Sequence, residues 1–397
     1  MKKLLVLAAG ILQVPVIKKA RKMGYYVIAA DGDSNAIGLQ YADESVVVNI
    51  TSEEDVLRFA REEGIDGVIH PCSEVSMNVM GRLNEELGLA GISREAAFRA
   101  TNKQLMREAF ERHGAPSPKS FCFDNVEDAW MCFCNELPNN GILKPSRNSG
   151  SRGIAKIDKS ISKELFTELF ERSKTESRDK TVMLEQFIEG PEFSVEIIVW
   201  NNEINVLTVT DKKTTEAPYF VELGHSQPSV FPVDIVAEIE SAAIAGVKAL
   251  EVTNCACHAE IKVQDGKAYI MEIGARLGGD FISTELTTLS TGIDMVAAAI
   301  NCALGIEPSL EPIKTKQAVC IRYFCPKPGK LVKISNLEIL NNPHVYQWEI
   351  YHKEGDIISE VTSSLCRTGH VIVTEETPLK AIDMAEELIN KVCIMTM

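Results

Sequence analysis

The sequence lacks an excess of positive charge. Its 397 residues include 41 Lys and Arg against 56 Asp and Glu, which gives a formal net charge of −15. An acidic surface repels phosphate backbones and anionic lipid head groups, so we expect neither generic nucleic-acid binding nor membrane-surface binding. A polyanionic substrate would need a local cluster of Lys and Arg, or a bound metal ion, to overcome that field.

The sequence also lacks an uninterrupted apolar run of about 18 residues, the length that spans a membrane. The uncharged run 4–17 follows two lysines and imitates a signal peptide. Gly10, Gln13 and Pro15 interrupt it, however, and basic residues follow where a cleavage site would lie. We therefore interpret this segment as a buried strand followed by a helix.

The cysteines do not have the pattern of a disulfide framework. They are eleven, an odd number, and are scattered from Cys72 to Cys393 in a chain long enough to bury a core without covalent help. The two Cys-x-Cys pairs, at 132 and 134 and at 255 and 257, lack the spacing of structural zinc sites. We expect free thiols and a cytoplasmic location.

Strands and helices alternate over residues 1–95, which predicts a parallel, doubly wound sheet. The expected strands are 4–9, 25–30, 45–48 and 67–70, and the expected helices are 14–23, 52–63 and 75–87. Later segments predict a helical stretch at 94–113, helices at 163–174, 235–250, 295–304 and 378–392, and strands at 182–187, 193–200 and 204–210 that look antiparallel.

The opening turn has one feature of dinucleotide-binding proteins. Asp31 lies 21 residues after Gly10, about where such a fold places its ribose-binding acid. The fingerprint needs three glycines and this turn has one, so we favour an ordinary strand–helix turn. An NAD-dependent oxidoreductase remains an alternative.

The segment from Lys144 to Gly153 is rich in Ser and Gly. Unencumbered amides can close over phosphates, and Lys144 supplies a positive charge at the base of the loop. The segment is not a Walker loop, because the Gly-Lys-Ser/Thr that opens a helix is missing. An exposed hairpin loop explains the segment equally well.

A third candidate runs from Met183 to Glu196. Its acidic residues punctuate an apolar strand that Gly190-Pro191 breaks. This suits a hinge where backbone groups meet a planar base and Glu192 reaches sugar hydroxyls. A charged edge strand is the alternative, and it is favoured on this segment alone.

The strongest candidate is the hairpin from His258 to Gly279. A three-residue turn at 264–266 would place its apolar residues on one face. Glu260 and Glu272 would then lie diagonally on the other face, with His258 directly opposite Glu272. A two-residue turn would mix apolar and polar residues and separate the carboxylates. Two neighbouring carboxylates suit Mg²⁺, although a solvated polar face is the alternative.

Together these segments, in this order, resemble the ATP-grasp superfamily, and most of all carboxylate–amine ligases of the L-amino-acid ligase type. Carbamoyl-phosphate synthase large-chain domains and phosphoribosylglycinamide synthetase are similar. The resemblance implies an α/β and α+β chain in three parts. These are a Rossmann-like pre-ATP-grasp domain at 1–95, an ATP-grasp domain at 96–305 with a lid lobe at about 120–190, and a C-terminal α+β extension at 306–397.

The resemblance also implies roles for individual residues. Lys103 and Lys144 would hold ATP phosphates, and Glu260 and Glu272 would coordinate Mg²⁺. Arg276 would face the reacting carboxyl group and, with Lys144, act in catalysis. The remaining nucleotide-binding residues would be Ser149, Gly150 and Ser151 in the lid loop, Glu185, Gln186, Phe187 and Ile188 at adenine, and Glu192 at the ribose. The substrate side would add Glu222, His225, Gly278 and Gly279.

The sequence departs from the family pattern at Gly274, where many relatives have Asn in the order Glu-x-Asn. Water or Asp280 could replace the missing ligand. The implied reaction activates a carboxylate as an acyl phosphate and joins it to an amine, releasing ADP and phosphate. His225, Glu222 and His258 are the candidate bases. The implied partners are a small carboxylate and a small amine, with a homodimer among the assemblies that the resemblance allows. A non-catalytic Mg-ATP-binding module is the main alternative.

Overall fold

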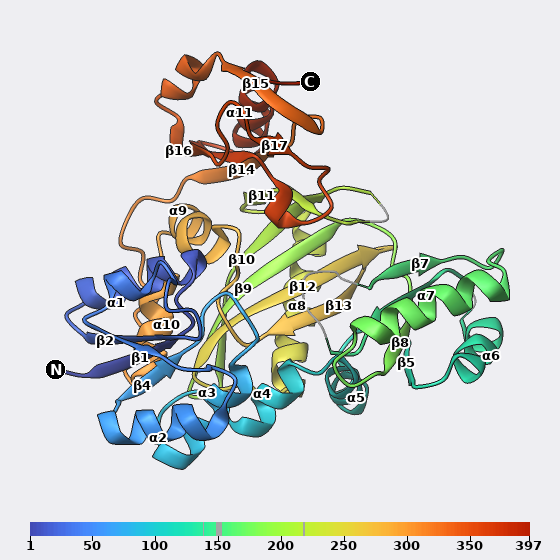
Figure 1. Ribbon diagram of the computed structural model, residues 1–397, viewed down its shortest axis with the longest axis horizontal. Helices are drawn as coiled ribbons and strands as arrows, with labels where there is room; N and C mark the ends of the chain where they lie inside the picture. The colour runs from blue at the N-terminus through green and yellow to red at the C-terminus, as the bar shows by residue number, and fades with distance from the viewer. Residues whose placement is uncertain (138, 148–152, 217–218) are drawn as a thin grey trace.

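The N-terminal sheet has four parallel strands in the order β3-β2-β1-β4. A computed structural model describes residues 1–137, 139–147, 153–216 and 219–397 and is shown in Figure 1. The strands are β1 (Lys3–Leu7), β2 (Tyr26–Asp31), β3 (Glu44–Val47) and β4 (Gly67–Ile69), and the helices that alternate with them are α1 (Val14–Lys22), α2 (Glu53–Glu63) and α3 (Met77–Leu87).

Both faces of this sheet are covered, because successive residues of a strand point to opposite sides. Leu5 and Leu7 of β1 pack in the same cluster as apolar residues of α2 and α3. Leu4 and Val6 pack with α1 and with α10 (Met295–Ala303). The predicted doubly wound arrangement is therefore confirmed.

Asp31 has a structural task at the end of β2. Its carboxylate accepts hydrogen bonds from the backbone N–H of Ala9 at 2.7 Å and of Asp33 at 2.9 Å. The carboxylate thus ties the first strand–helix turn to the neighbouring strand, which agrees with our preference for an ordinary turn.

The helical stretch predicted at 94–113 is two helices, α4 (Arg94–Ala100) and α5 (Lys103–His113). Asn102 separates them, and its side chain caps α5 by accepting from the N–H of Leu105 at 3.1 Å. The break places Lys103 at the first position of α5, facing the centre of the molecule.

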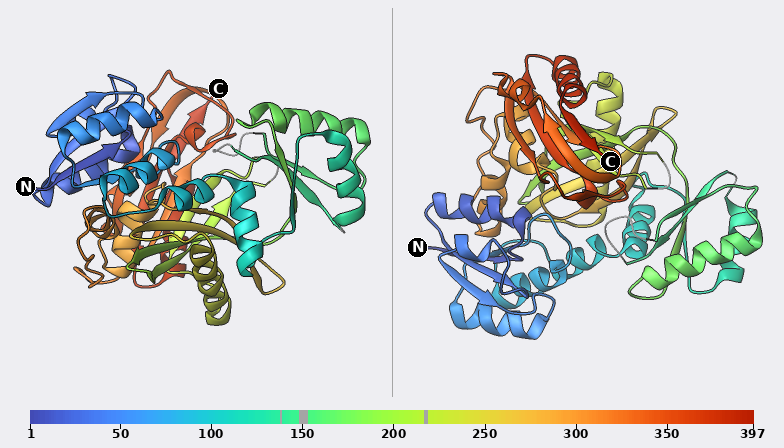
Figure 2. Two further views of the ribbon diagram at one scale, coloured as in Figure 1. Left: turned by 90° about the horizontal axis from the view of Figure 1, so that it is seen from below. Right: turned by 45° about the horizontal axis from the view of Figure 1, so that its top comes forward.

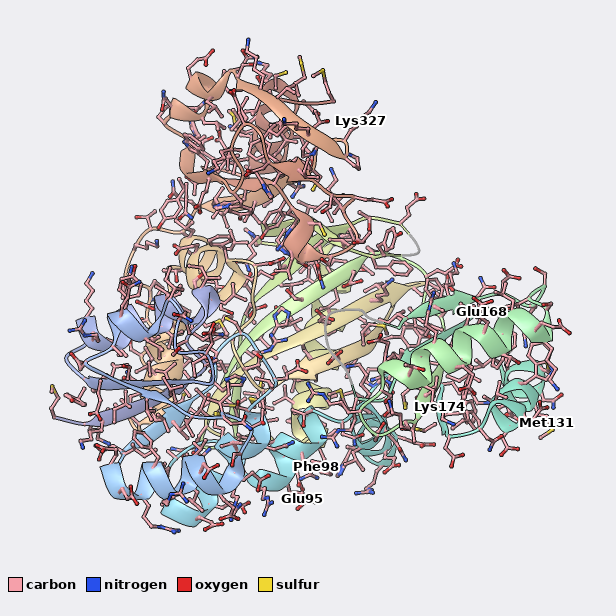
Figure 3. The ribbon with its side chains drawn as sticks, viewed as in Figure 1. Glu95, Phe98, Met131, Glu168, Lys174 and Lys327 are labelled. Carbon is pink, nitrogen blue, oxygen red and sulfur yellow. The ribbon has the colours of Figure 1, made fainter. Side chains whose placement is uncertain are left out.

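The segment from Ser120 to Gln186 forms a separate antiparallel sheet in the order β5-β8-β6-β7. Its strands are β5 (Ser120–Phe123), β6 (Gly141–Pro145), β7 (Ala155–Ile157) and β8 (Val182–Gln186), covered by α6 (Val126–Glu136) and α7 (Lys163–Glu176). Phe133 and Phe166 stack at 5.6 Å beneath the helices. This unit projects to one side of the molecule, with Met131 on its outer side (Figures 2 and 3).

The largest sheet has eight strands in the order β13-β12-β9-β10-β11-β14-β18-β16. They are β9 (Glu192–Trp200), β10 (Glu203–Thr214), β11 (Glu222–Gln227), β12 (Cys255–Gln264), β13 (Lys267–Gly274), β14 (Ala318–Phe324), β16 (Val345–Ile350) and β18 (Gly369–Glu375). Three strands from beyond residue 306 therefore extend the sheet that carries the predicted metal-binding hairpin.

The remaining described elements are three helices, five short helical turns and a small sheet of three strands. They are the helices α8 (Val233–Ala249), α9 (Thr287–Thr291) and α11 (Pro378–Lys391), the short helical turns η1 (Ile11–Gln13), η2 (Leu39–Tyr41), η3 (Ile282–Leu286), η4 (Leu337–Asn341) and η5 (Ser364–Cys366), and a small sheet of β15 (Gly329–Ser335), β17 (Ile357–Ile358) and β19 (Cys393–Thr396). Helix α11 packs on the C-terminal strands, as Figure 1 shows.

Two strands that the sequence suggested as neighbours lie in different sheets. Strand β8 pairs with β5 and β6, whereas β9 pairs with β10 and β12. The chain crosses between the sheets at Gly190-Pro191. Gly190 has φ of +119°, and a Cβ there would lie 2.1 Å from the carbonyl oxygen of Val263, so a side chain does not fit.

The predicted register of the β12–β13 hairpin is wrong. The turn contains two residues, Asp265 and Gly266, both with positive φ, as in a type I′ turn. The apolar pattern still fits because Met271 is an extra residue in β13, and this bulge shifts the pairing by one. Glu260 consequently lies directly opposite Glu272, rather than diagonally, and His258 lies opposite Gly274.

All eleven cysteines lie in the described residues and are free, as the sequence predicted. Among those residues, no single helix is long and apolar enough to cross a membrane. One pair bent by 118°, Ile282–Thr291 with Met295–Ala303, meets the criteria of length and composition only.

Candidate active site

A cavity of about 730 Å³ lies between the antiparallel sheet of β5, β6, β7 and β8 and the large sheet. Most of the residues that the sequence singled out line it, namely Lys103, Lys144, Glu185, Gln186, Phe187, Ile188, Glu192, Glu222, Glu260, Glu272 and Arg276. His225, Gly278 and Gly279 are not among the lining residues. Ser149, Gly150 and Ser151 lie outside the described residues.

The paired carboxylates of Glu260 and Glu272 form one wall of this cavity. They stand directly opposite each other on adjacent strands, so their side chains share one face of the sheet. Within the described part of the chain, no three His, Cys, Asp or Glu residues form a group that could enclose a metal ion. Two carboxylates fit Mg²⁺, which takes its remaining oxygens from water and substrate phosphates.

Lys103 faces these carboxylates from the start of α5. Its Nζ lies 2.9 Å from Oε1 of Glu272. Burial opposes the charged form, but Glu272 and Glu74 outweigh it and raise the pKa of Lys103 above its ordinary value. The site therefore holds a cation beside the predicted metal ligands.

Lys144 belongs to a buried cluster with Glu185 and Arg107. Oε2 of Glu185 lies 2.5 Å from Nζ of Lys144, and Oε1 accepts from Nε of Arg107 at 2.8 Å. Burial, aided by Arg107 and Lys103, lowers the pKa of Lys144 to about 8 against the pull of Glu185. Burial would raise the pKa of Glu185, but the positive charges of Arg107 and Lys144 lower it to about 2. Glu185 thus positions Lys144.

Sequence reasoning missed Arg107. It lies four residues after Lys103 on α5, on the face that also carries the buried Met106 and Phe110. Its Nη2 donates to the carbonyl oxygen of Met271 at 2.7 Å, at the residue that forms the hairpin bulge. An arginine on the apolar face of a predicted helix was the available signal, because a charge that becomes buried needs a partner.

Aromatic and aliphatic side chains line the cavity next to the hinge between the sheets. The rings of Phe187 and Phe220 lie 6.3 Å apart, and Nζ of Lys262 lies 5.4 Å from the first ring and 5.7 Å from the second. The N–H of Phe187 donates to the carbonyl of Asn140 at 3.0 Å. This end of the cavity can stack a planar ring.

Lys212 is the most prominent residue that the sequence did not single out. Its side chain is 2% exposed and contacts Glu192 at 2.6 Å, Glu260 at 3.1 Å and Glu222 at 3.6 Å. Burial opposes its charge, but the three carboxylates raise its pKa well above the ordinary value. Lys212 thereby connects three residues with different predicted roles, namely Glu192 at the ribose, Glu260 at the metal ion and Glu222 at the substrate.

His258 lies behind the carboxylate of Glu260. Its Nδ1 donates to Oε1 of the fully buried Glu196 at 2.6 Å, and its Nε2 lies 3.8 Å from Glu260. Burial opposes protonation, but Glu196 raises the pKa of His258 to about 9. Ser283 donates to the second oxygen of Glu196 at 3.0 Å.

Arg276 lies at the end of β13 and reaches toward the N-terminal sheet. Its Nη2 donates to Oε1 of Glu74 at 3.1 Å, in the segment between β4 and α3. A Cβ at Gly274 would lie 3.2 Å from both Cζ and Nε of Arg276. The guanidinium thus packs in the space that a side chain at residue 274 would need.

Asp280, suggested from the sequence as a replacement metal ligand, has other partners. Its carboxylate accepts from both terminal nitrogens of Arg367, at 2.6 and 2.7 Å, and Nε2 of His225 lies 3.3 Å away. Neither Asp280 nor His225 is among the residues that line the cavity. Asp280 therefore lies apart from the residues that line the cavity, with its oxygens paired to arginine.

These features define the class of protein. Residues 137–285 match the family of ATP-grasp domains, and the chain therefore carries an ATP-grasp domain. Residues 322–397 match a second family, the L-amino acid ligase C-terminal domain 2. The chain thus combines an ATP-grasp domain with a C-terminal domain of L-amino acid ligases, as its motifs predicted.

Known proteins are similar over much or all of the chain. Alanine–anticapsin ligase from Bacillus subtilis is 28% identical over 293 residues, which cover 68% of this chain and 61% of that protein. The structure of phosphoribosylglycinamide synthetase from Anaerococcus prevotii is 25% identical, with a TM-score of 0.80 and full coverage of both chains. L-amino acid ligase from Bacillus licheniformis is 21% identical, with a TM-score of 0.83 and coverage of 100% and 99%.

The predicted fold class is thereby confirmed. The chain spans 50% to 61% of the length of the first curated relatives that it matches.

Proposed function

We propose that this protein is an ATP-dependent ligase that activates a carboxylate as an acyl phosphate and joins it to an amine. The observation that carries the proposal is one cavity in which Glu260 and Glu272 stand side by side, with Lys103, Lys144 and Arg276 around them. The matched families and the names of the relatives support the same chemistry.

The nucleotide would lie with its base at the aromatic end and its phosphates between the two lysines. Phe187 and Ile188 offer a flat apolar wall, and Lys144 and Lys103 concentrate the positive charge that the acidic chain otherwise lacks. Mg²⁺ bound by Glu260 and Glu272 would neutralise charge on the phosphates. Positioning and neutralisation supply most of the catalysis of phosphoryl transfer.

Arg276 would hold the reacting carboxyl group. Its guanidinium faces the cavity and matches a carboxylate in a planar, bidentate geometry. The same group would stabilise the oxyanion that forms when the amine attacks the acyl phosphate. Glu74, its partner in the structure, keeps the guanidinium in place until the substrate arrives.

The candidate bases differ in their suitability. Nδ1 of His258 is held by the buried Glu196 and its Nε2 faces Glu260, so both ring nitrogens are directed at carboxylates rather than at an incoming amine. His225 does not reach the cavity wall. We therefore propose that Glu222 binds the substrate amine. Glu222 lines the cavity, and its carboxylate can accept a hydrogen bond or a proton from the amine.

The test is a phosphate-release screen over pairs of carboxylic acids and amines, followed by mass spectrometry of the product. Glu272→Gln is the control variant, because it keeps the shape of the side chain and removes the charge that would bind Mg²⁺. We expect ADP, phosphate and an amide from the wild type and loss of Mg-dependent ADP release in the variant.

Tight Mg-ATP binding without ADP formation across the whole screen would favour the non-catalytic alternative. Full activity of Glu272→Gln would show that the β12–β13 hairpin does not bind the metal ion. The homodimer remains an expectation, and sedimentation of the purified chain measures it.

A further inference from the structure

A short segment of the C-terminal region reaches the cavity. Thr362, Ser363, Ser364 and Leu365 line it, although they lie far beyond the matched ATP-grasp residues 137–285. Leu365 is an apolar residue that lines the cavity and is nevertheless 94% exposed. An apolar side chain presented to an open cavity is suited to contact a ligand.

Arg367 fixes this segment in place. Its Nε donates to the carbonyl oxygen of Ser364 at 2.8 Å, and its terminal nitrogens bind Asp280. Its guanidinium also lies 3.6 Å from the centre of the Tyr323 ring. These contacts attach the segment both to the large sheet and to the chain that follows the hairpin. The segment is therefore a built wall rather than a free loop.

The wall contacts Glu222, the residue that we assign to the substrate amine. Ser364 donates to Oε2 of Glu222 at 3.2 Å, which places the segment beside the residue assigned to the amine. Nη1 of Arg367 also contacts the carbonyl oxygen of Glu222 at 3.4 Å. Val221, which precedes Glu222 in the chain, is a further apolar residue of the cavity lining.

We propose that Thr362–Leu365 form one wall of the amino-acid subsite beside Glu222, and that Leu365 selects a substrate with an apolar side chain. This inference rests on the proposed ligase function. Leucine offers no hydrogen bond, so a charged substrate side chain placed against it would lose water without gaining a partner. An apolar side chain would instead bury its surface against Leu365.

The first test compares L-leucine and L-aspartate as substrates in the product assay. The variants are Leu365→Asp and Leu365→Ala, and the control is Leu379→Asp, which changes another exposed leucine of the C-terminal region that is not among the cavity-lining residues. We expect Leu365→Asp to lower kcat/KM for L-leucine by about tenfold or more. The KM for ATP should stay unchanged, and Leu365→Ala should lie between Leu365→Asp and the wild type.

The second test measures binding of the amino acid without relying on product formation. Cys366 follows Leu365, and hydrogen bonding by Ser363 lowers the pKa of its thiol to about 6. We therefore expect the thiol to react with iodoacetamide at pH 7. Peptide mass spectrometry would follow alkylation of Cys366, with the exposed Cys393 as internal reference. We expect L-leucine with Mg-ATP to slow alkylation of Cys366 severalfold, and L-aspartate to slow it less.

The outcomes separate the two proposals. A wild type that forms product, with selectivity unchanged in Leu365→Asp and no protection of Cys366, overturns this inference and leaves the ligase function standing. An equal loss for both amino acids also overturns it, because a misfolded site would have that effect. A wild type that forms no product with any pair overturns the function and the inference with it.

Discussion

Nδ1 of His258 lies 2.6 Å from Oε1 of Glu196, and this buried ion pair stands directly behind the predicted metal ligand Glu260. Gly278 packs against the pair, because a Cβ at that residue would lie 2.6 Å from Nδ1 of His258 and 3.1 Å from Oε2 of Glu196. Gly278 was predicted to touch substrate. Its contacts instead support a role in keeping His258 and Glu196 in place.

Replacing Gly278 by Ala should disturb this pair, because the new methyl group has no room. We expect the free energy of unfolding to fall by about 1–3 kcal/mol and ligase activity to fall with it. Gly279→Ala is the matched control, since nothing lies within 4 Å of its Cβ position. Urea denaturation and phosphate release measure both effects. Equal stability of the two variants would contradict the assignment.

Replacing Gly274 by Asn would complete the Glu-x-Asn pattern that the family resemblance implies, yet we expect it to harm the enzyme. The new side chain would displace the guanidinium of Arg276, which lies 3.2 Å from the Cβ position. The expected result is a loss of kcat/KM of about tenfold, with a smaller loss in Gly274→Ala. A gain of activity in the Asn variant would show that the missing ligand matters more than the position of Arg276.

ATP binding should weaken at alkaline pH because of Lys144. Below its pKa of about 8 the amine is already charged, so affinity should be constant there. Above pH 8 the free protein must first take up a proton, and Kd should rise by up to about tenfold per pH unit. Calorimetry in buffers of different ionisation enthalpy detects that proton. Lys144→Met should bind weakly and take up no such proton, and uptake in that variant would assign it to another group.

The protein should lose stability on mild acidification because of His70. This imidazole is buried, its Nε2 accepts from the N–H of Ser76 at 3.3 Å, and its Nδ1 donates to Leu7 at 2.8 Å. Burial lowers its pKa from 6.5 to about 4. Between pH 6.5 and 4, His70 is protonated in the unfolded chain but not in the folded chain, so the free energy of unfolding falls as the pH falls.

Over the range from pH 6.5 to pH 4, His70 should lower the free energy of unfolding by a total on the order of 3 kcal/mol. His70→Gln keeps a donor and an acceptor but does not titrate. Its unfolding free energy should therefore depend less steeply on pH in this window than that of the wild type. Thermal or urea unfolding at several pH values provides the measurement, and identical pH profiles would refute the assignment.

The elements were predictable where local pattern decides them. Leu4–Leu7 are buried on both faces, and Asn102 is a capping residue, so the strands and helices around them follow from side-chain spacing and local hydrogen bonds. The hairpin register was not predictable in this way. A single extra residue, Met271, shifts the pairing without breaking the apolar face, and period-two counting does not detect such a bulge.

The partners of buried charges could not be predicted either. Lys212 has the sequence context of a solvated strand residue, and it is buried only because three other strands bring Glu192, Glu222 and Glu260 to it. The same holds for Arg107 with Glu185 and for Arg367 with Asp280.

The sequence by itself determined the class of this protein, through ordered charged residues on short elements whose local structure their own pattern dictates. It also identified the carboxylates and lysines that meet in the cavity. Only the tertiary structure decided which charge pairs with which, and that the C-terminal segment ending at Leu365 closes one wall of the site. The physical reason is that burial and ion pairing depend on contacts between residues far apart in the chain, which no local pattern records.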